Sequence, residues 1–256
     1  MPGDCRGIVG RHWRDQRHAG RGRIVKPAQV RELFERLQTL NPAPVTELEH
    51  ANPFELLIAV ILSAQATDRS VNIATRRLFP VASTPEQILA LGADGLTAYV
   101  KSIGLYPGKV KNILATCRLL IERHGGGVPA DREALEELPG VGRKTANVVL
   151  NSAFRLPTMP VDTHIFRVAN RLGLARGDTP RAIEDGLLEV IPAQYLLNAH
   201  HWLLLHGRYV CKARRPECQR CPLVDLCAFK DKALPPATAL PLAKPRKPSP
   251  AARGRA

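Results

Sequence analysis

The chain has 256 residues, a formal net charge of +14 at pH 7 and a pI near 10.0. This length allows one large domain or two modest domains, and no apolar run approaches the roughly 20 residues that a membrane span requires. A positive excess of this size is expected of a protein that binds phosphate groups, as nucleic-acid-binding proteins do.

Most of the positive charge lies at the two ends of the chain. Residues 1–26 carry a net charge of +5 and residues 235–256 another +5, which leaves +4 for the residues between them. Six prolines also fall within residues 235–256. Such segments do not build a packed core, so we expect residues 1–23 to be a disordered basic arm and residues 233–256 a disordered Pro-rich basic tail. The two ends are either weakly adhesive arms or contributors to general nucleic-acid affinity.

Helical periodicity dominates residues 27–232. The first apolar stripe has the i, i+3, i+4, i+7 spacing of one helix face and consists of Val30, Leu33, Phe34 and Leu37. Asn52 is then placed to cap a second helix, with Pro53 at its first position. The stripe of that helix consists of Phe54, Leu57, Ile58 and Ile61. Asp68 is predicted to cap a third helix.

The helical pattern continues to the last third of the chain. Ser83 or Thr84, just before Pro85, predicts the start of a fourth helix. A long helix follows Pro107, with an apolar stripe of Val110, Ile113, Leu114, Cys117 and Ile121, and Gly125–Gly127 end it. Further helices are predicted after Asp131, after Thr179-Pro180 and over residues 194–206. No segment alternates apolar and polar residues long enough to predict a strand, so the predicted fold class is all-α.

A glycine turn separates two of these helices. Pro139, Gly140 and Gly142 interrupt the helix that Asp131 opens, and an apolar run then starts a new helix. Such a turn exposes backbone N–H groups at the start of the second helix, where the helix dipole also favours an anion. Glycines allow a phosphate to approach the main chain closely. The pattern is that of a helix-hairpin-helix, which grips a nucleic-acid backbone; Lys144 in the first turn of its second helix is unusual.

Four of the six cysteines lie close together, with the spacing C-x6-C-x2-C-x5-C. They are Cys211, Cys218, Cys221 and Cys227. Without a secretory signal, we expect an intracellular protein, in which clustered cysteines indicate a metal centre rather than disulfides. Structural zinc prefers two short chelating pairs, whereas this chain has one, so the spacing favours a [4Fe–4S] cluster over zinc. The basic residues of the same loop, Lys212, Arg214, Arg215 and Arg220, form either a solvated loop or a phosphate-binding surface.

A third pattern begins at Pro160 and runs through Asp162 to His164. Apolar residues at helical spacing follow it, so Asp162 is a plausible N-cap, and capping alone would explain an aspartate at this position. A catalytic role requires that Asp162 face Lys144 across a cleft. The spacing of His164 and the later histidines matches no metal motif, and structural hydrogen bonding is the better interpretation of them.

These motifs together resemble the endonuclease III family, whose members are iron–sulfur DNA glycosylases of the helix-hairpin-helix superfamily. The resemblance covers roughly residues 27–232. Besides the cysteine spacing, it lies in Leu62–Asp68 (LSAQATD), Ile103–Tyr106 (IGLY), Leu138–Asn151 (LPGVGRKTANVVLN), Val161–Val168 (VDTHIFRV) and His206–Tyr209 (HGRY). The chain departs from the family pattern at Pro107-Gly108, where polar or charged residues are more common.

The resemblance implies a bifunctional enzyme that excises oxidised pyrimidines from duplex DNA and nicks the strand 3′ to the abasic site by β-elimination. Lys144 would displace the base and form a Schiff base with the opened sugar. Only the neutral amine attacks carbon, and burial and a helix N-terminus, both expected at Lys144, disfavour the ammonium form. Asp162, kept ionised by the helix start that it caps, would stabilise positive charge on the sugar and assist proton transfers.

The resemblance also implies the residues that contact DNA. Chemistry at C1′ requires that the nucleotide be flipped out of the duplex. Gln65 and Leu105 would fill the gap, Gln65 facing the orphan base and Leu105 acting as an apolar wedge. The remaining expected DNA contacts are Gly140, Gly142, Arg143, Thr145 and His164.

The architecture that the resemblance implies has two helical lobes with a DNA-binding cleft between them. Residues 46–157 would form a helical barrel that ends in the helix-hairpin-helix. Residues 24–45 and 158–232 would form the lobe that carries the [4Fe–4S] cluster. We expect a monomer acting on double-stranded DNA with oxidised pyrimidines or abasic sites. It would have no membrane association and would be cytoplasmic or nucleoid-associated in a bacterium, and organellar or nuclear in a eukaryote.

Three other functions compete with this interpretation. An adenine-removing mismatch glycosylase lacks the lysine, has a catalytic glutamate in the region of Ser63-Ala64-Gln65, and adds a C-terminal recognition domain. A non-catalytic DNA-binding module leaves Lys144, Asp162 and the four cysteines unexplained. A zinc-stabilised structural protein is the third alternative, and it would lack the absorbance near about 400 nm of an iron–sulfur protein.

Overall fold

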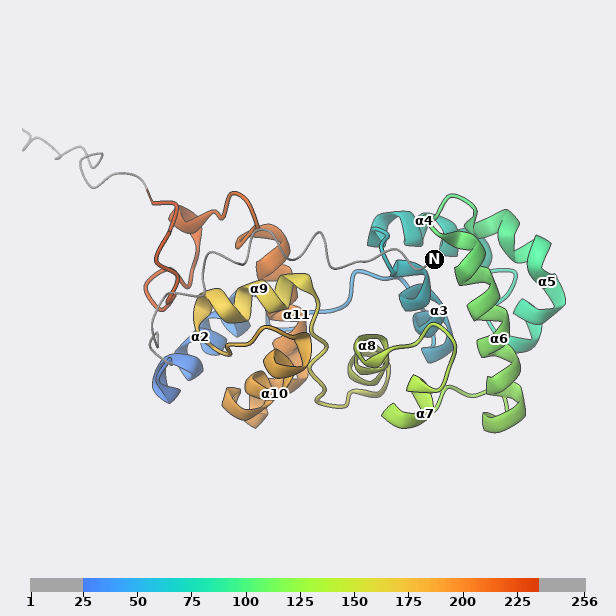
Figure 1. The fold of residues 1–256 in the computed structure, drawn as a ribbon, viewed down its shortest axis with the longest axis horizontal. Helices are drawn as coiled ribbons and strands as arrows, with labels where there is room; N and C mark the ends of the chain where they lie inside the picture. Colours follow the sequence, from blue (N-terminus) through green and yellow to red (C-terminus); the bar gives the residue numbers. More distant parts are fainter. Residues whose placement is uncertain (1–24, 235–256) are drawn as a thin grey trace, which may run out of the picture.

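The computed structural model describes residues 25–234, which form two helical lobes side by side (Figure 1). Within these residues there are ten α-helices, one short 3₁₀ helix and no strand, which confirms the all-α prediction. The predicted basic arm, residues 1–23, lies outside the described residues, as does the tail from residue 235 onward. None of the described helices combines the length and hydropathy needed to cross a bilayer.

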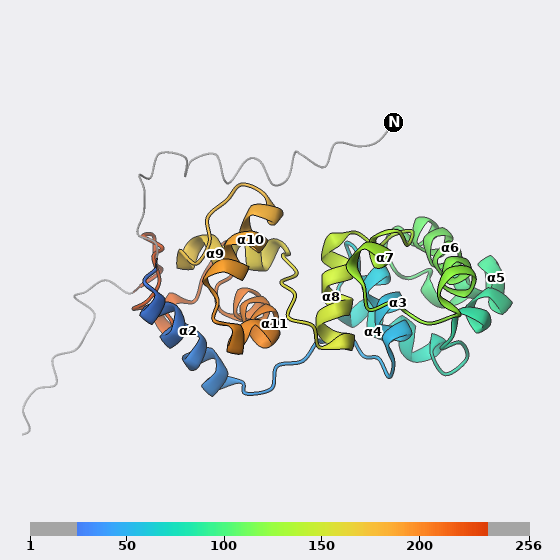
Figure 2. The same ribbon diagram turned by 90° about the horizontal axis from the view of Figure 1, so that it is seen from below.

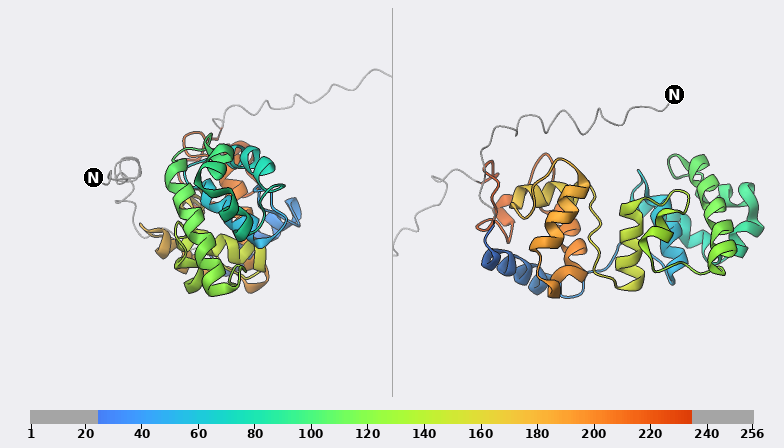
Figure 3. Two further views of the ribbon diagram at one scale, coloured as in Figure 1. Left: turned by 90° about the vertical axis from the view of Figure 1, so that its right-hand side faces the viewer. Right: turned by 60° about the horizontal axis from the view of Figure 1, so that its bottom comes forward.

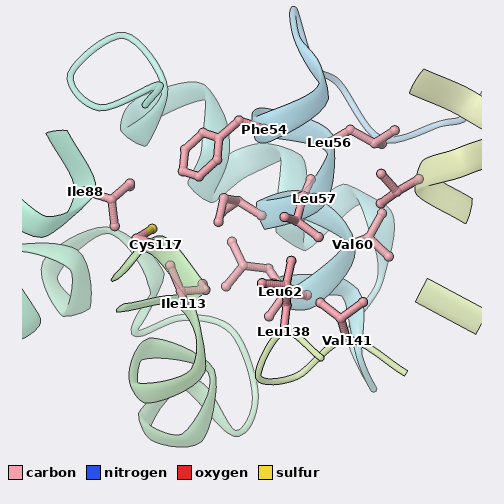
Figure 4. Close-up of a cluster of buried hydrophobic side chains, with 14 of the residues drawn as sticks. Phe54, Leu56, Leu57, Val60, Leu62, Ile88, Ile113, Cys117, Leu138 and Val141 are labelled. Carbon is pink, nitrogen blue, oxygen red and sulfur yellow. The ribbon is translucent and has the colours of Figure 1, made fainter. Parts of the chain in front are cut away.

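The first lobe contains six helices around one apolar core. They are α3 (Pro53–Ser63), α4 (Asp68–Leu78), α5 (Pro85–Val100), α6 (Tyr106–His124), α7 (Arg132–Glu136) and α8 (Arg143–Phe154). Helix α3 runs through the middle of this core (Figure 4), and all nine of its residues from Phe54 to Leu62 are buried. A helix that is apolar on every face must be surrounded by protein, which explains why α3 is central.

The second lobe is built from both ends of the described chain. It contains α2 (Pro27–Leu40), α9 (Thr163–Leu172), α10 (Pro180–Val190), α11 (Ala193–Tyr209) and the 3₁₀ helix η2 (Cys218–Arg220). Phe34 of α2 packs against two aromatic rings of α11, stacked on Tyr195 at 5.7 Å and tilted against Trp202 at 6.2 Å. These contacts attach α2 to helices that lie more than 120 residues later in the chain. The two cores fall within the two predicted segments, and the division of the chain into these two domains stays a prediction.

Side-chain caps begin several helices where the sequence predicted them. Asn52, Thr84, Asp131 and Thr179 each accept a hydrogen bond from the backbone N–H three residues later. The prediction for the third helix was wrong by one residue. Thr67 caps α4, and Asp68 is its first residue, where a carboxylate still interacts favourably with the helix dipole.

The lobes are joined by two crossings of the chain, residues 41–52 and 155–162 (Figure 2). Helix α8 lies on the side of the first lobe that faces the second (Figure 3). Asn151 of α8 donates from Nδ2 to the Leu197 carbonyl of α11 at 3.1 Å. Thus α8, which contains the second helix of the predicted hairpin, is also one of the helices through which the lobes touch.

Candidate active site

The predicted hairpin is present as α7, a glycine turn and α8. Gly140 has a φ of 82°, a conformation that disfavours any residue with a side chain. A Cβ at this position would also lie 2.9 Å from Nδ2 of Asn112 on α6. Gly140 is therefore required by the turn itself, in addition to any contact with DNA.

Gly142 leaves the start of α8 open. It is the N-cap of α8 and supplies no side-chain hydrogen bond, unlike Asp131 of α7 and Asp162 of α9. No atom lies within 4 Å of a Cβ built at Gly142, and the residue is exposed. The first N–H groups of α8 consequently have no side-chain cap, which is the arrangement that binds a phosphate at a helix start. Thr145 lies half-buried in the same first turn.

Lys144 is the second residue of α8 and lines an open hollow of about 290 Å³. Arg143 and Val161 also line the hollow. The rest of its wall comes from the start of α10 and consists of Thr179, Pro180, Arg181 and Glu184. The helix N-terminus expected at Lys144 is present. The expected burial is absent, because the Lys144 side chain is exposed at the edge of its lobe.

Asp162 caps α9, and its Oδ1 accepts a hydrogen bond from the Ile165 backbone N–H at 2.8 Å. The predicted N-cap is thereby confirmed. The side chain is half-buried and follows Val161, which shares the hollow with Lys144. Lys144 and Val161 thus line this hollow from opposite lobes, whereas Asp162 adjoins it through Val161 and is not among its lining residues.

His200 of α11 is buried next to the segment that leads to Asp162. Its Nδ1 is 2.9 Å from the Pro160 carbonyl oxygen, two residues before Asp162. Burial, with smaller contributions from the neighbouring His201 and the positive charge of Lys144, lowers the pKa of His200 to about 3. A neutral His200 can donate from Nδ1 to Pro160, which holds the segment that leads to Asp162.

His164, expected to contact DNA, is half-buried in the first turn of α9. Its Nδ1 is 3.2 Å from a terminal nitrogen of Arg167. Arg167 itself is buried, and it donates to the carbonyl oxygens of Gly207 at 2.9 Å and Cys211 at 3.1 Å. Arg167 therefore connects the helix that Asp162 caps to the backbone of the cysteine loop. The hydrogen-bonding interpretation of His164 describes this geometry.

Arg143 is held in an ion pair between the lobes. Its Nε and one terminal nitrogen donate to the two carboxylate oxygens of Glu184 on α10, at 2.8 and 2.9 Å. Asn147 donates to the same carboxylate at 3.1 Å. The predicted phosphate contact of Arg143 stays a prediction, and in this geometry its backbone N–H is freer to make it than its guanidinium.

The HGRY segment forms a second polar bridge between the lobes. Arg208 pairs with Asp68 at the start of α4 and with Glu47, and the Tyr209 hydroxyl donates to Glu47. Burial lowers the pKa of Arg208, but its hydrogen bond to Asp68 and the charge of that residue raise it more, and the net pKa is raised. Bridges through Arg143 and Arg208 fix the position of the two lobes.

Gln65 and Leu105 lie at two loop tips of the first lobe. Gln65 is exposed between α3 and α4, and Leu105 is 65% exposed just before α6. Both have a left-handed backbone, with φ of 54° and 60°. Among the described non-glycine residues, Arg155 alone shares this conformation. Such strain at exposed tips is typical of functional sites.

Lys109 is a polar residue at these loops that the sequence did not single out. It is 6% exposed, and its Nζ donates to the Leu62 carbonyl oxygen at 2.9 Å. Its helical register could have predicted that it is buried. Lys109 lies four residues before Ile113 and eight before Cys117, on the apolar face of α6.

The four clustered cysteines line a single small pocket. The segment that carries them, residues 211–227, lies at the end of the second lobe away from α8 (Figure 1). Among residues 25–234, no three His, Cys, Asp or Glu side chains are grouped closely enough to hold one metal ion. Four thiols around one pocket fit the four corners of an iron–sulfur cluster.

Positive groups surround the cysteine pocket. Arg171 lines the pocket, and its guanidinium is 3.5 Å from the Cys211 sulfur and donates to the Lys212 carbonyl at 2.8 Å. The Cζ atom of Arg171 also lies over the Phe229 ring, 4.7 Å from its centre. Arg214 and Arg215 are exposed on the adjoining loop. These charges would offset thiolate charge, and they leave a basic surface facing outward.

Comparison with protein families gives two matches. Residues 58–193 match the model of the HhH-GPD superfamily base excision DNA repair protein. Residues 211–227, which begin and end at cluster cysteines, match the iron–sulfur binding domain of endonuclease III.

Individual relatives match over most of their length. The chain is 59% identical to endonuclease III of Escherichia coli K12 over 201 residues, or 78% of this chain and 95% of the relative. It is 60% identical to that of Haemophilus influenzae over the same shares. Endonuclease III of Treponema pallidum is 56% identical, over 80% of this chain and 97% of its own.

Solved structures of the same kind share the fold. A non-covalent endonuclease III–DNA complex superposes with a TM-score of 0.75 and 46% identity, over 79% of this chain and 95% of that chain. A trapped endonuclease III–DNA covalent intermediate gives a TM-score of 0.74 at the same identity and coverage.

Proposed function

The chain belongs to the endonuclease III family of base excision repair DNA glycosylases, and we propose that it excises oxidised pyrimidines from duplex DNA and then acts as an abasic-site lyase. Enzymes of this family carry a [4Fe–4S] cluster, as this chain does. The family shares DNA glycosylase activity, and the proposal adds the class of damaged base and the residues that carry out the reaction.

Lys144 is the proposed nucleophile. Its amine attacks C1′ as the glycosidic bond breaks, and the departing base takes up a proton. The ring then opens, and a Schiff base links Nζ to C1′. Loss of a C2′ proton breaks the C3′–O bond, which cleaves the strand 3′ to the abasic site. A free lysine has a pKa near ~10.4, so only about one in 2,500 is neutral at pH 7. Because Lys144 is exposed in this structure, covering by bound DNA would supply the desolvation that favours its neutral form.

Asp162 is the proposed electrostatic partner. Its Oδ1 accepts a hydrogen bond from the Ile165 N–H, which fixes the carboxylate at the start of α9. From this position it would stabilise positive charge that develops on the sugar and assist the proton transfers. The hydrogen bond between His200 and Pro160 supports the segment from behind.

The turn between α7 and α8 is proposed to bind the DNA backbone. The open N–H groups after Gly140 and Gly142 would bind a phosphate next to Lys144, with Arg143, Thr145 and His164 nearby. Gln65 and Leu105 would fill the gap that the flipped nucleotide leaves. Their exposure and left-handed backbone support this role, because both side chains are held out from the surface.

Cys211, Cys218, Cys221 and Cys227 are the proposed ligands of the [4Fe–4S] cluster. When bound, the cluster would fix the loop that carries Arg214 and Arg215, so that these exposed side chains face DNA. We further propose a monomer that acts on chromosomal DNA.

The position of Lys144 carries the proposal. It lies at the uncapped start of α8 and shares a hollow with the residue that precedes Asp162. An adenine-removing mismatch glycosylase is disfavoured because Ser63-Ala64-Gln65 contains no acid.

Borohydride trapping tests the proposal. The purified holoprotein would be incubated with a duplex that contains one oxidised pyrimidine and then reduced. A covalent protein–DNA adduct is expected for the wild type and for Lys230→Ala, which removes another exposed lysine. No adduct is expected for Lys144→Ala. An adduct that persists in Lys144→Ala, or a wild type that forms none, would contradict the assignment.

A further inference from the structure

Lys109 is the one lysine among residues 25–234 that is buried. It lies in the first turns of α6, four residues after Leu105. Its side chain crosses to α3 and donates to the Leu62 carbonyl oxygen at 2.9 Å. Burial lowers the pKa of Lys109 below its ordinary value, which shows that this position is costly for an ammonium group.

The acceptor explains how this cost is offset. Leu62 is the next-to-last residue of α3, and the last four carbonyl groups of a helix lack intrahelical partners. The C-terminal end of a helix also carries partial negative charge, which favours a cation. Lys109 therefore caps α3 from another helix, through a side chain that comes from 47 residues later.

Each end of this hydrogen bond adjoins one of the two strained loop tips. Gln65 lies three residues after Leu62, in the turn closed by the Ala66 N–H to the Ser63 carbonyl at 3.0 Å. Leu105 is the N-cap of α6, and its carbonyl accepts from the Lys109 backbone N–H at 3.4 Å. The backbone of Lys109 thus contacts one loop, and its side chain contacts the helix end that starts the other.

We propose that Lys109 is a positioning residue that holds the Gln65 loop and the Leu105 loop at a fixed separation, so that both insert into the duplex together. This inference rests on the proposed insertion of Gln65 and Leu105. The two tips belong to different helix pairs, α3–α4 and α5–α6, and a direct link between them lowers the entropy that is lost when both side chains must enter one gap.

The alternative is that Lys109 only stabilises the end of α3. The two roles give different results. A stabilising cap affects the melting temperature alone, whereas a positioning residue also affects the separation of the orphan base from the duplex. An apolar residue of the same length removes the buried charge and its cost together, so we expect Lys109→Met to fold.

The test compares four variants of the holoprotein. Lys109→Met removes the donor, and Lys109→Arg keeps a cationic donor. Lys111→Met makes the same substitution at an exposed position of α6. Ile113→Val removes one methylene from the fully buried face of α6, so it lowers stability and keeps the hydrogen bond from Lys109 to Leu62.

The direct readout is the fluorescence of 2-aminopurine placed opposite a tetrahydrofuran abasic analogue, which reports separation of the orphan base. Base excision at saturating enzyme is measured in parallel on an oxidised pyrimidine. For Lys109→Met we expect loss of most of the fluorescence change and a fall of about tenfold in the excision rate constant. Lys109→Arg should recover part of both, and Lys111→Met and Ile113→Val should behave as wild type at the lesion.

The inference would be overturned if Lys109→Met and Ile113→Val, at equal melting temperature, gave the same fluorescence change and the same excision rate constant. Leu105→Ala separates this failure from failure of the proposed function. If Leu105→Ala abolishes the fluorescence change while Lys109→Met does not, insertion stands and the role of Lys109 is wrong. If Leu105→Ala has no effect, the proposed insertion is wrong, and the inference fails with it.

Discussion

Arg143 and Glu184 join the two lobes beside the candidate nucleophile. The guanidinium makes two hydrogen bonds to the carboxylate, at 2.8 and 2.9 Å, and the Glu184 side chain is only 6% exposed. Lys144 follows Arg143 directly, so the ion pair fixes the first turn of α8 against the lobe that carries Asp162. The position of Lys144 relative to Asp162 therefore depends on an interaction between the lobes as well as on the fold of each lobe.

Glu184→Gln should weaken this junction. The substitution leaves the partly buried guanidinium with only the more distant Glu136 carboxylate. We expect a loss of about 1–2 kcal/mol in the free energy of unfolding, below the value for a fully buried pair because the Arg143 side chain is 30% exposed. Denaturant unfolding measures it. Schiff-base trapping at saturating abasic DNA should also slow, because the ion pair no longer fixes the position of Lys144 relative to the lobe that carries Asp162.

Glu136→Gln is the matched control for Glu184→Gln. Its carboxylate lies 3.8 Å from the same guanidinium but is 37% exposed and lies in the same lobe as Arg143. We expect little change in stability or trapping from this variant. Equal effects of Glu136→Gln and Glu184→Gln would argue against the role of the junction between the lobes.

Two adjacent histidines of α11 predict a loss of stability in acid. Burial lowers the pKa of His200 to about 3 and that of His201 to about 4, compared with about 6.5 in the unfolded chain. Each ring is neutral when folded and takes up a proton on unfolding. The stability is complete above about pH 6.5 and is lost as the pH falls toward 4, at up to about 1.4 kcal/mol per pH unit for each histidine.

His201→Phe isolates one of these contributions. The ring of His201 packs edge-on against that of His200 at 5.0 Å, and phenylalanine keeps an aromatic ring there without a titrating group. The free energy of unfolding should fall less steeply between pH 6.5 and 4 than in the wild type, with the packing effect removed by comparison at pH 8. An unchanged slope would mean that His201 is protonated with little cost in the folded protein.

The sequence predicted what depends on local chemistry. Caps such as Asn52 and Asp162, the Gly140 turn and the apolar stripes all follow from residues a few positions apart, so their structures could be predicted. The Arg143–Glu184 pair could not, because it joins residues 41 positions apart with no shared pattern. The left-handed backbones of Gln65 and Leu105 also escaped prediction, because neither residue type favours that conformation.

The two glycines of the hairpin should differ in what their substitution affects. Gly140→Ala places a Cβ 2.9 Å from Asn112 in a backbone with φ of 82°, and we expect a loss of about 1–3 kcal/mol in the free energy of unfolding. Gly142→Ala meets no atom within 4 Å and should cost less than about 1 kcal/mol.

Gly142→Ala should reduce DNA affinity, although it has little effect on stability. Its added methyl group would occupy open space at the start of α8, where the proposed phosphate approaches, so binding to an abasic duplex should weaken while the melting temperature stays near that of the wild type. Titration at several salt concentrations measures the affinity and the number of phosphate contacts. Unchanged affinity in Gly142→Ala would argue against a phosphate at this turn.

Removal of one cysteine tests what the cluster loop contributes. The buried core of the second lobe consists mainly of α2, α9, α10 and α11, and Leu223 is the single core residue from the loop between Cys211 and Cys227. We therefore expect Cys221→Ala to lose the absorbance near about 400 nm while it keeps a cooperative transition close to the wild-type melting temperature. Its DNA affinity should fall, because Arg214 and Arg215 are no longer held in place.

Cys117→Ala is the matched control for Cys221→Ala. Cys117 is fully buried in the core of the other lobe (Figure 4), far from the cysteine pocket. Its substitution should keep the absorbance and the DNA affinity but cost about 1 kcal/mol of stability through lost packing. If Cys221→Ala instead loses its cooperative transition, the cluster is required for folding of the second lobe, and a role limited to DNA-binding geometry is wrong.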